Sequence, residues 1–157
     1  LAKQAGARYA VLTTKHHDGF ALHDSKTTEF DAGSQLHRDL VREFVEAFRA
    51  EGLRVGFYHS VIDWHHEQYE YARSKQLPHP LKGTAYPNGN RNHAQYLEYL
   101  HSQVNELISN YGPLDILWWD YSAQDFQGDL NAAWPSVAGR TADSLSFASF
   151  ESPPIAR

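Results

Sequence analysis

Polar side chains able to do chemistry stand at three points where apolar stretches of the chain end. An apolar run over residues 114–119 leads into Asp120, a carboxylate that could act as a nucleophile, an acid or a base. A β-branched stretch is followed by His16 and His17, and another apolar stretch leads into Tyr58. Imidazole and phenol groups can hydrogen-bond a polyhydroxylated ligand or move protons. These residues are the candidate functional site.

Each of these endings follows a segment typical of a buried strand. The predicted strands cover residues 8–14, 53–60 and 114–120. Between them, apolar residues recur with helical spacing, which predicts helices over residues 37–51 and 92–111. Asp39 and Asn92 suit the N-termini of these helices because their side chains can accept free backbone N–H bonds. Gly52 and Gly112 suit their C-terminal ends.

The remaining segments have weaker patterns. Residues 21–36 show no period, and we expect them to be irregular. Residues 61–91 contain several Pro and Gly and read as a long excursion loop, with a short helical piece near 65–75. We expect His65 and His66, in that loop, to be exposed to solvent.

Strands that alternate with helices predict parallel β-α-β units in an α/β fold. Two architectures have this order: a closed (β/α)8 TIM-type barrel and an open doubly wound sheet. No Gly-rich phosphate loop follows any strand, which favours the barrel. The chain would hold about three parallel strands of it with their intervening helices. Since catalytic groups of such barrels lie at the carboxyl ends of the strands, the three polar endings should meet on one rim.

Strand alternation adds a prediction about Trp118. It shares a strand face with Asp120, whereas Trp119 lies on the other face. If Asp120 faces the mouth of a barrel, Trp118 lies beneath it and could pack on the apolar side of a sugar. We expect Trp119 to be a core residue.

Composition excludes several function classes. The chain has 157 residues, a net charge of −5 and no basic run, so nucleic acid is not an expected partner. It has no cysteine, which excludes disulfides and cysteine-ligated metals. No apolar run approaches the roughly 20 residues of a membrane helix, and no signal peptide is visible.

The two ends of the chain have distinct characters. The chain contains no methionine, even at position 1, and opens like the end of a helix, so we expect a fragment of a longer protein. Residues 1–130 form the predicted piece of a barrel domain. Residues 131–157 are rich in Ala, Ser and Pro and have no strong period. This atypical tail is either a surface segment or a sequence that is not native to the barrel, such as a frame-shifted one.

The residue types alone leave alternatives open. A carboxylate at a strand end can also cap the following turn. His16 and His17 could be metal ligands, could hydrogen-bond a sugar, or could tie down a turn. A metal needs a third ligand, which His59 or the later histidines could supply, but adjacent histidines tend to point apart. A metal-dependent barrel hydrolase using His16, His17 and Asp120 therefore ranks below sugar binding.

Four segments of the chain resemble the α-L-fucosidases of glycoside hydrolase family 29. They are residues 9–20, 38–41, 56–60 and 116–120, and the resemblance covers about residues 1–130. Residues 14–20, Thr-Lys-His-His-Asp-Gly-Phe, form the most specific of these motifs. The resemblance implies a retaining glycoside hydrolase that releases α-L-fucose from fucosylated glycans or glycosides. It implies no metal and no cofactor.

The same resemblance implies roles for five residues. Asp120 corresponds to the nucleophile, and His16 and His17 to the pair that hydrogen-bonds the fucose hydroxyls. Tyr58 corresponds to a tyrosine at the fucose subsite, and Trp118 to a tryptophan near the methyl group of the sugar. The family's acid/base carboxylate and a substrate-binding Arg come from later segments, and nothing after residue 130 matches them. An upstream His and a Glu-Trp pair would precede residue 1.

We therefore expect this chain to carry a nucleophile without an identifiable acid/base. Retention requires two carboxyl groups roughly 5–5.5 Å apart, so the isolated chain should not turn over an aryl α-L-fucoside. A non-catalytic sugar-binding remnant, or a fragment without function, remains an alternative.

Overall fold

The structure, a computed structural model, describes residues 1–69 and 91–120. The strands and helices are β1 (Tyr9–Lys15), α1 (Ala32–Leu36), α2 (Leu40–Ala50), β2 (Arg54–Ser60), α3 (His93–Asn110) and β3 (Ile116–Asp120). The predicted strands and both long helices are confirmed, with ends shifted by a few residues. The predicted tail, residues 131–157, lies outside the described residues.

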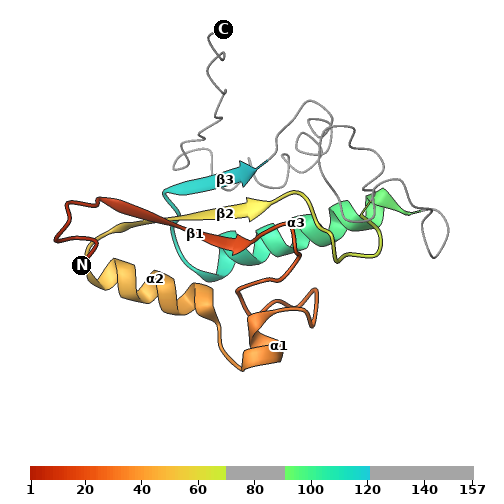
Figure 1. The fold of residues 1–157 in the computed structure, drawn as a ribbon, viewed down its shortest axis with the longest axis horizontal. Helices are drawn as coiled ribbons and strands as arrows, with labels where there is room; N and C mark the ends of the chain where they lie inside the picture. Colours follow the sequence, from red (N-terminus) through yellow and green to blue (C-terminus); the bar gives the residue numbers. More distant parts are fainter. Residues whose placement is uncertain (70–90, 121–157) are drawn as a thin grey trace, which may run out of the picture.

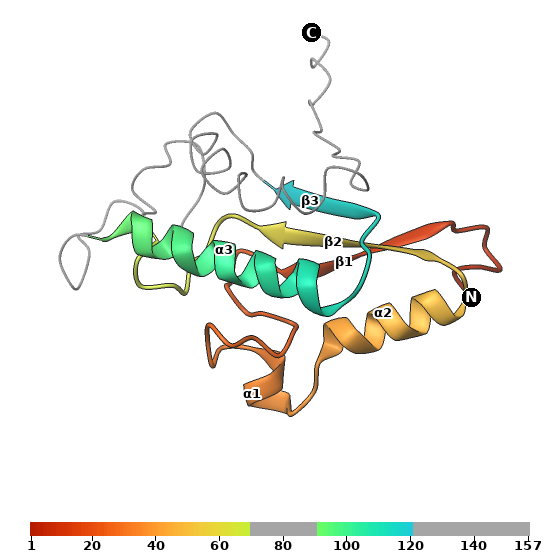
Figure 2. The same cartoon turned by 180° about the vertical axis from the view of Figure 1, so that it is seen from behind.

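The three strands form one parallel sheet in the order β1-β2-β3. All three run in the same direction, and α2 and α3 lie on the same side of the sheet (Figures 1 and 2). The parallel β-α-β arrangement expected from the sequence is therefore present, as part of an α/β fold. In the described part of the chain, no helix is long and apolar enough to cross a membrane.

Both long helices begin where the sequence predicts. The Asp39 side chain accepts a hydrogen bond from the backbone N–H of Arg42 at 2.9 Å, which caps α2. Asn92 accepts from the N–H of Gln95 at 3.4 Å at the start of α3. The Tyr111 hydroxyl also donates to Asp39 at 2.7 Å, so one carboxylate links the start of α2 to the end of α3.

The main core lies between this pair of helices and the sheet. Val55, Phe57 and Leu117 point from the strands into it and are almost completely buried. The helices and the segment between α3 and β3 contribute the rest: Val41, Val45, Val104, Leu107, Tyr111 and Leu114. Burying aliphatic and aromatic side chains of this size contributes about 1.5–3 kcal/mol each, so this layer holds the helices to the sheet.

A second core cluster lies beyond the carboxyl end of β2. Here the segment after the strand packs on the first turns of α3, through Val61, Ile62, Tyr69, Tyr96 and Leu100. Residues 61–69 contain turns and bends but no helix. The rest of the predicted short helical piece near 65–75 lies outside the described residues.

The prediction that residues 21–36 are irregular is wrong at their end. Asp31 accepts from the backbone N–H of Ser34 at 2.8 Å and from its hydroxyl at 3.0 Å, which starts the five-residue helix α1. Ala32 at its first position is fully buried. A helix this short has too few residues to show an apolar period, which is why the sequence pattern does not predict it.

The strand β1 contains one irregularity. Thr13 pairs with Tyr58 and Lys15 pairs with His59, so Thr14 is an extra residue in the ladder. Such a bulge bends the strand and changes the direction of the side chains that follow. Lys15 consequently points to the helix-covered side of the sheet, where it is fully buried.

Candidate functional site

The carboxyl ends of all three strands meet at one edge of the sheet. β1 ends at Lys15, β2 at Ser60 and β3 at Asp120, and the backbones of Ser60 and Asp120 are paired neighbours. His16 and His17 follow β1 directly at this edge. The structure therefore brings together the strand endings that the sequence singled out, including the backbone position of Asp120.

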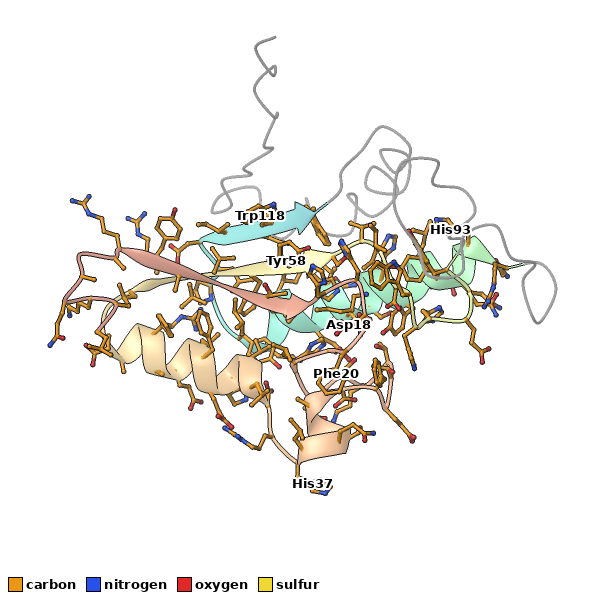
Figure 3. The ribbon with its side chains drawn as sticks, viewed as in Figure 1. Asp18, Phe20, His37, Tyr58, His93 and Trp118 are labelled. Carbon is orange, nitrogen blue, oxygen red and sulfur yellow. The ribbon has the colours of Figure 1, made fainter. Side chains whose placement is uncertain are left out.

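An aromatic row crosses the face of the sheet opposite α2 and α3, here called the open face because none of the described helices covers it. The rings of His16 and Tyr58 are stacked, with centroids 6.0 Å apart and 14° between their planes. Tyr58 meets Trp118 edge to face at 5.8 Å, and Figure 3 shows the two side chains on neighbouring strands. Trp118 is 39% exposed. Aromatic faces beside phenol and imidazole groups can bind both the apolar and the hydroxyl-bearing sides of a sugar ring.

His17 is buried beside this row and is held on several sides. Its Nδ1 lies 2.6 Å from Ser60 Oγ, and its ring stacks on that of His16 at 4.2 Å. The ring of Trp64 lies 5.6 Å away. Ser60 Oγ also donates to the carbonyl of Ile62 at 3.0 Å, which uses its only proton. On that assignment His17 Nδ1 is the donor to Ser60 Oγ.

A second pair of polar residues lies on the helix-covered side of the same edge. The Thr14 hydroxyl donates to the carbonyl of Tyr58 at 2.9 Å and accepts from Nδ1 of His59 at 2.9 Å. His59 is fully buried, and its pKa is held well below its ordinary value by burial first, then by the charges of Lys15 and His23. Its ring therefore lies on the face opposite Tyr58, away from the aromatic row.

The expectation that His65 and His66 are both solvated is wrong for His66. Its ring packs against those of Tyr96 and Tyr99 at 5.4 and 4.3 Å, and burial lowers its pKa. His65 is exposed, but it stacks on Phe30 at 4.0 Å. Within residues 1–69 and 91–120, no group of three or more His, Cys, Asp or Glu side chains is placed to hold a metal ion.

The loop after His17 is anchored to α3 by one carboxylate. Glu106 accepts from Ser25 Oγ at 2.8 Å and from the N–H of Lys26 at 2.7 Å, and it lies 3.0 Å from His23 Nε2. Burial would raise the pKa of Glu106, but the hydrogen bonds from these three residues together lower it. The segment that follows the histidine pair is thereby fixed to the helical layer.

Sequence reasoning missed the residues that support the site from behind. Ser60, Lys15, Asp63 and Trp64 all touch, or lie next to, the histidine pair. The sequence signal for these residues is their position, because each lies within four residues of a predicted strand end. Only the register and the fold show which side chains turn toward the histidines.

Three comparisons with known proteins agree. The sequence model of the family Alpha-L-fucosidase matches residues 1–148. The human tissue alpha-L-fucosidase is 33% identical over 126 residues, which cover 76% of this chain and 23% of that protein. Alpha-L-fucosidase 1 of Arabidopsis thaliana is 31% identical over 134 residues, covering 83% of this chain and 22% of that protein. The chain thus spans about a quarter of the length of these relatives.

Solved structures give the same answer. Alpha-L-fucosidase isoenzyme 1 from Paenibacillus thiaminolyticus superposes with a TM-score of 0.82 at 43% identity, over 92% of this chain and 35% of that one. The alpha-L-fucosidase AlfC from Lactobacillus casei, in complex with its α-L-fucose product, superposes with a TM-score of 0.76 at 29% identity, over 92% of this chain and 47% of that one. The match in sequence and in backbone places this chain in the α-L-fucosidase family.

Proposed function

We propose that this chain forms the fucose-binding side of a retaining α-L-fucosidase built on a (β/α)8 barrel, acting on fucosylated glycans or glycosides. The observation that carries the proposal is the aromatic row of His16, Tyr58 and Trp118 at the sheet edge where β3 ends on Asp120. The relative from Lactobacillus casei that holds its α-L-fucose product supports fucose as the ligand.

In this proposal Asp120 is the nucleophile. Its carboxylate attacks C1 of the fucosyl group, the bond to the leaving oxygen breaks, and a covalent fucosyl-enzyme forms; water then releases fucose with the original configuration. A second carboxyl group must protonate the leaving oxygen, and no residue of this chain is assigned to that step. His16 and His17 hydrogen-bond sugar hydroxyls, and Tyr58 and Trp118 contact the ring and its methyl group. No metal or cofactor takes part.

A consequence is that the 157 residues alone should bind fucose without hydrolysing fucosides. Three parallel strands supply one portion of a barrel, and each solved relative named above is more than twice as long as the portion matched. The open face that carries Tyr58 and Trp118 would become the inner face of a closed barrel. Binding groups on that face are present here, whereas the step that protonates the leaving group is unassigned.

Labelling with an activated fluorosugar tests the nucleophile separately from the unassigned acid. A 2-deoxy-2-fluoro-α-L-fucosyl fluoride carries a leaving group that needs no protonation, so Asp120 alone could be labelled. We expect mass spectrometry to find one fucosyl adduct on the peptide that contains Asp120, and none in Asp120→Asn. Excess fucose should slow the labelling.

Fucose binding, adduct formation and turnover, measured on the same chain, separate the alternatives. Fucose binding by calorimetry without an adduct would indicate a non-catalytic sugar-binding remnant. Turnover of an aryl α-L-fucoside by the chain, abolished in Asp120→Asn, would contradict the inactivity of the isolated chain while supporting the nucleophile. A folded chain that shows neither fucose binding nor an adduct would overturn the proposal.

A further inference from the structure

Two buried charges lie directly behind the histidine pair. Lys15 Nζ is 3.1 Å from Asp63 Oδ2, and the two side chains are only 0% and 1% exposed. Burial lowers the pKa of Lys15, and Asp63 opposes that shift. A buried ion pair gains little net stability, because its attraction mainly offsets the cost of removing both charges from water. A gain in folding stability therefore does not explain why this ion pair is present.

The pair fixes the backbone around it. The other oxygen of Asp63, Oδ1, accepts the backbone N–H groups of His65 and His66 at 2.9 and 2.7 Å. Lys15 Nζ also lies over the rings of Tyr99 and Tyr96, at 5.3 and 5.9 Å from their centroids. The carboxylate therefore holds the turn after β2 and the ammonium at the end of β1 at the same time.

The end of β1 and the loop after β2, joined in this way, lie on either side of His17. Lys15 stands two residues before it, and Asp63 directly precedes Trp64, whose N–H donates to the His17 carbonyl at 2.7 Å. Asp63 also lies close to the segment after His17, since a Cβ on Gly19 would lie 2.5 Å from Asp63 Oδ1. Only glycine fits there, and its φ of 85° also suits glycine. Any shift of Asp63 would therefore be transmitted to the residues on both sides of His17.

We propose that the Lys15–Asp63 pair is a positioning clamp: it holds the loop of residues 61–66 against the segment of residues 16–19 and so sets the orientation of the His17 imidazole. The inference rests on the proposed function only where it concerns fucose; the position of His17 can be measured without any sugar. Lys15 and Asp63 touch no substrate in this proposal and act through His17.

Three variants of the 157-residue chain separate positioning from bulk stability. Lys15→Met leaves a buried carboxylate without its partner, Asp63→Asn leaves a buried ammonium, and the double variant removes both charges. Each single variant should lose stability to urea, and the double variant should recover most of it, because no uncompensated charge remains. The exposed pair Lys26–Asp24, at 3.0 Å, provides matched controls in Lys26→Met and Asp24→Asn.

The deciding measurement is the imidazole nitrogen NMR spectrum of His17 without sugar, assigned with His17→Gln. If the pair positions His17, the chemical shifts of its two ring nitrogens should move away from the values typical of an Nδ1 donor in both single variants. They should remain displaced in the double variant. Fucose affinity in the double variant should then fall by about 10-fold, the equivalent of one well-placed hydrogen bond. The control variants should match the parent in all three measurements.

Recovery of the His17 signals together with stability in the double variant would overturn the clamp. An unfolded double variant would overturn it as well, because the pair would then be needed for folding in general. Displaced His17 signals in a chain whose parent does not bind fucose would support the clamp and contradict the fucose site, so the two proposals fail separately.

Discussion

The two faces of the sheet differ in what their side chains do. On the face covered by α2 and α3, Val55, Phe57 and Leu117 are buried in the core. On the opposite face, the next residues along the same strands, Tyr58 and Trp118, form part of an aromatic row that is partly exposed. A shift of one position along a strand thus separates a residue that is buried in the core from one that lies on the opposite face of the sheet.

The largest predicted effect concerns the covered face. Replacing Phe57 by Ala should reduce the free energy of unfolding by about 3–5 kcal/mol, because the ring is fully buried and packs edge to face on Tyr111 at 5.9 Å. Urea denaturation of the two chains measures this difference. Trp118→Ala, on the open face, should cost less than about 1 kcal/mol. Equal losses of unfolding free energy in the two variants would contradict the prediction that only the covered face holds the fold together.

A second prediction concerns His59, the histidine of β2, whose side chain lies on the covered face. His59 stays neutral in the folded chain because burial keeps its pKa well below 6.5, whereas in the unfolded chain it takes up a proton near pH 6.5. Below that pH the unfolded state binds more protons than the folded state, so stability falls as the pH drops from 7 toward 5. One such proton corresponds to a slope of up to about 1.4 kcal/mol per pH unit.

Urea titrations at several pH values measure this slope. In His59→Gln the slope should be shallower by the contribution of that proton, while other histidines with lowered pKa values, such as His66 and His101, still contribute. An unchanged slope in His59→Gln would mean that His59 is not kept neutral by the covered face.

The smallest predicted effect concerns the open face and a ligand. Trp118→Ala should weaken fucose binding by about 1 kcal/mol, roughly five-fold, the value of one aromatic contact. Tyr9→Ala is the matched control, because Tyr9 is another aromatic residue, 57% exposed, at the amino end of β1. Calorimetric titration with fucose should distinguish the two variants. Equal affinities would show that the carboxyl end of the open face has no special part in binding.

The sequence predicted the features that depend on local pattern. The strands and both long helices follow from apolar periodicity and from caps such as Asp39 and Asn92. Alternation along β2 and β3 correctly placed Tyr58 on one face of its strand and His59 on the other. The convergence of His16, Tyr58 and the end of β3 followed from the parallel order of the strands.

Features that depend on contacts between distant segments could not be predicted in this way. The pairing of Lys15 with Asp63 joins the end of β1 to the loop after β2, far away in sequence, and a lysine after a predicted strand reads as exposed. His66 reads as a solvated loop residue, yet it packs on α3. The helix α1 is too short for a period, so its buried first residue, Ala32, gives no signal.

The bulge at Thr14 has a consequence for how substitutions in β1 should be planned. Up to Thr13 the odd-numbered residues face the open side, but after Thr14 the even-numbered His16 does, beside Tyr58. The single extra residue therefore shifts by one position which residues of the strand face each side of the sheet. Deleting Thr14 should leave Lys15 opposite His59 and His16 beside Tyr58, because the regular ladder would then run from Thr13 directly to Lys15. A regular ladder that kept Thr14 would instead pair it with His59 and exchange the environments of Lys15 and His16, with a charge on the open face and an imidazole in the interior.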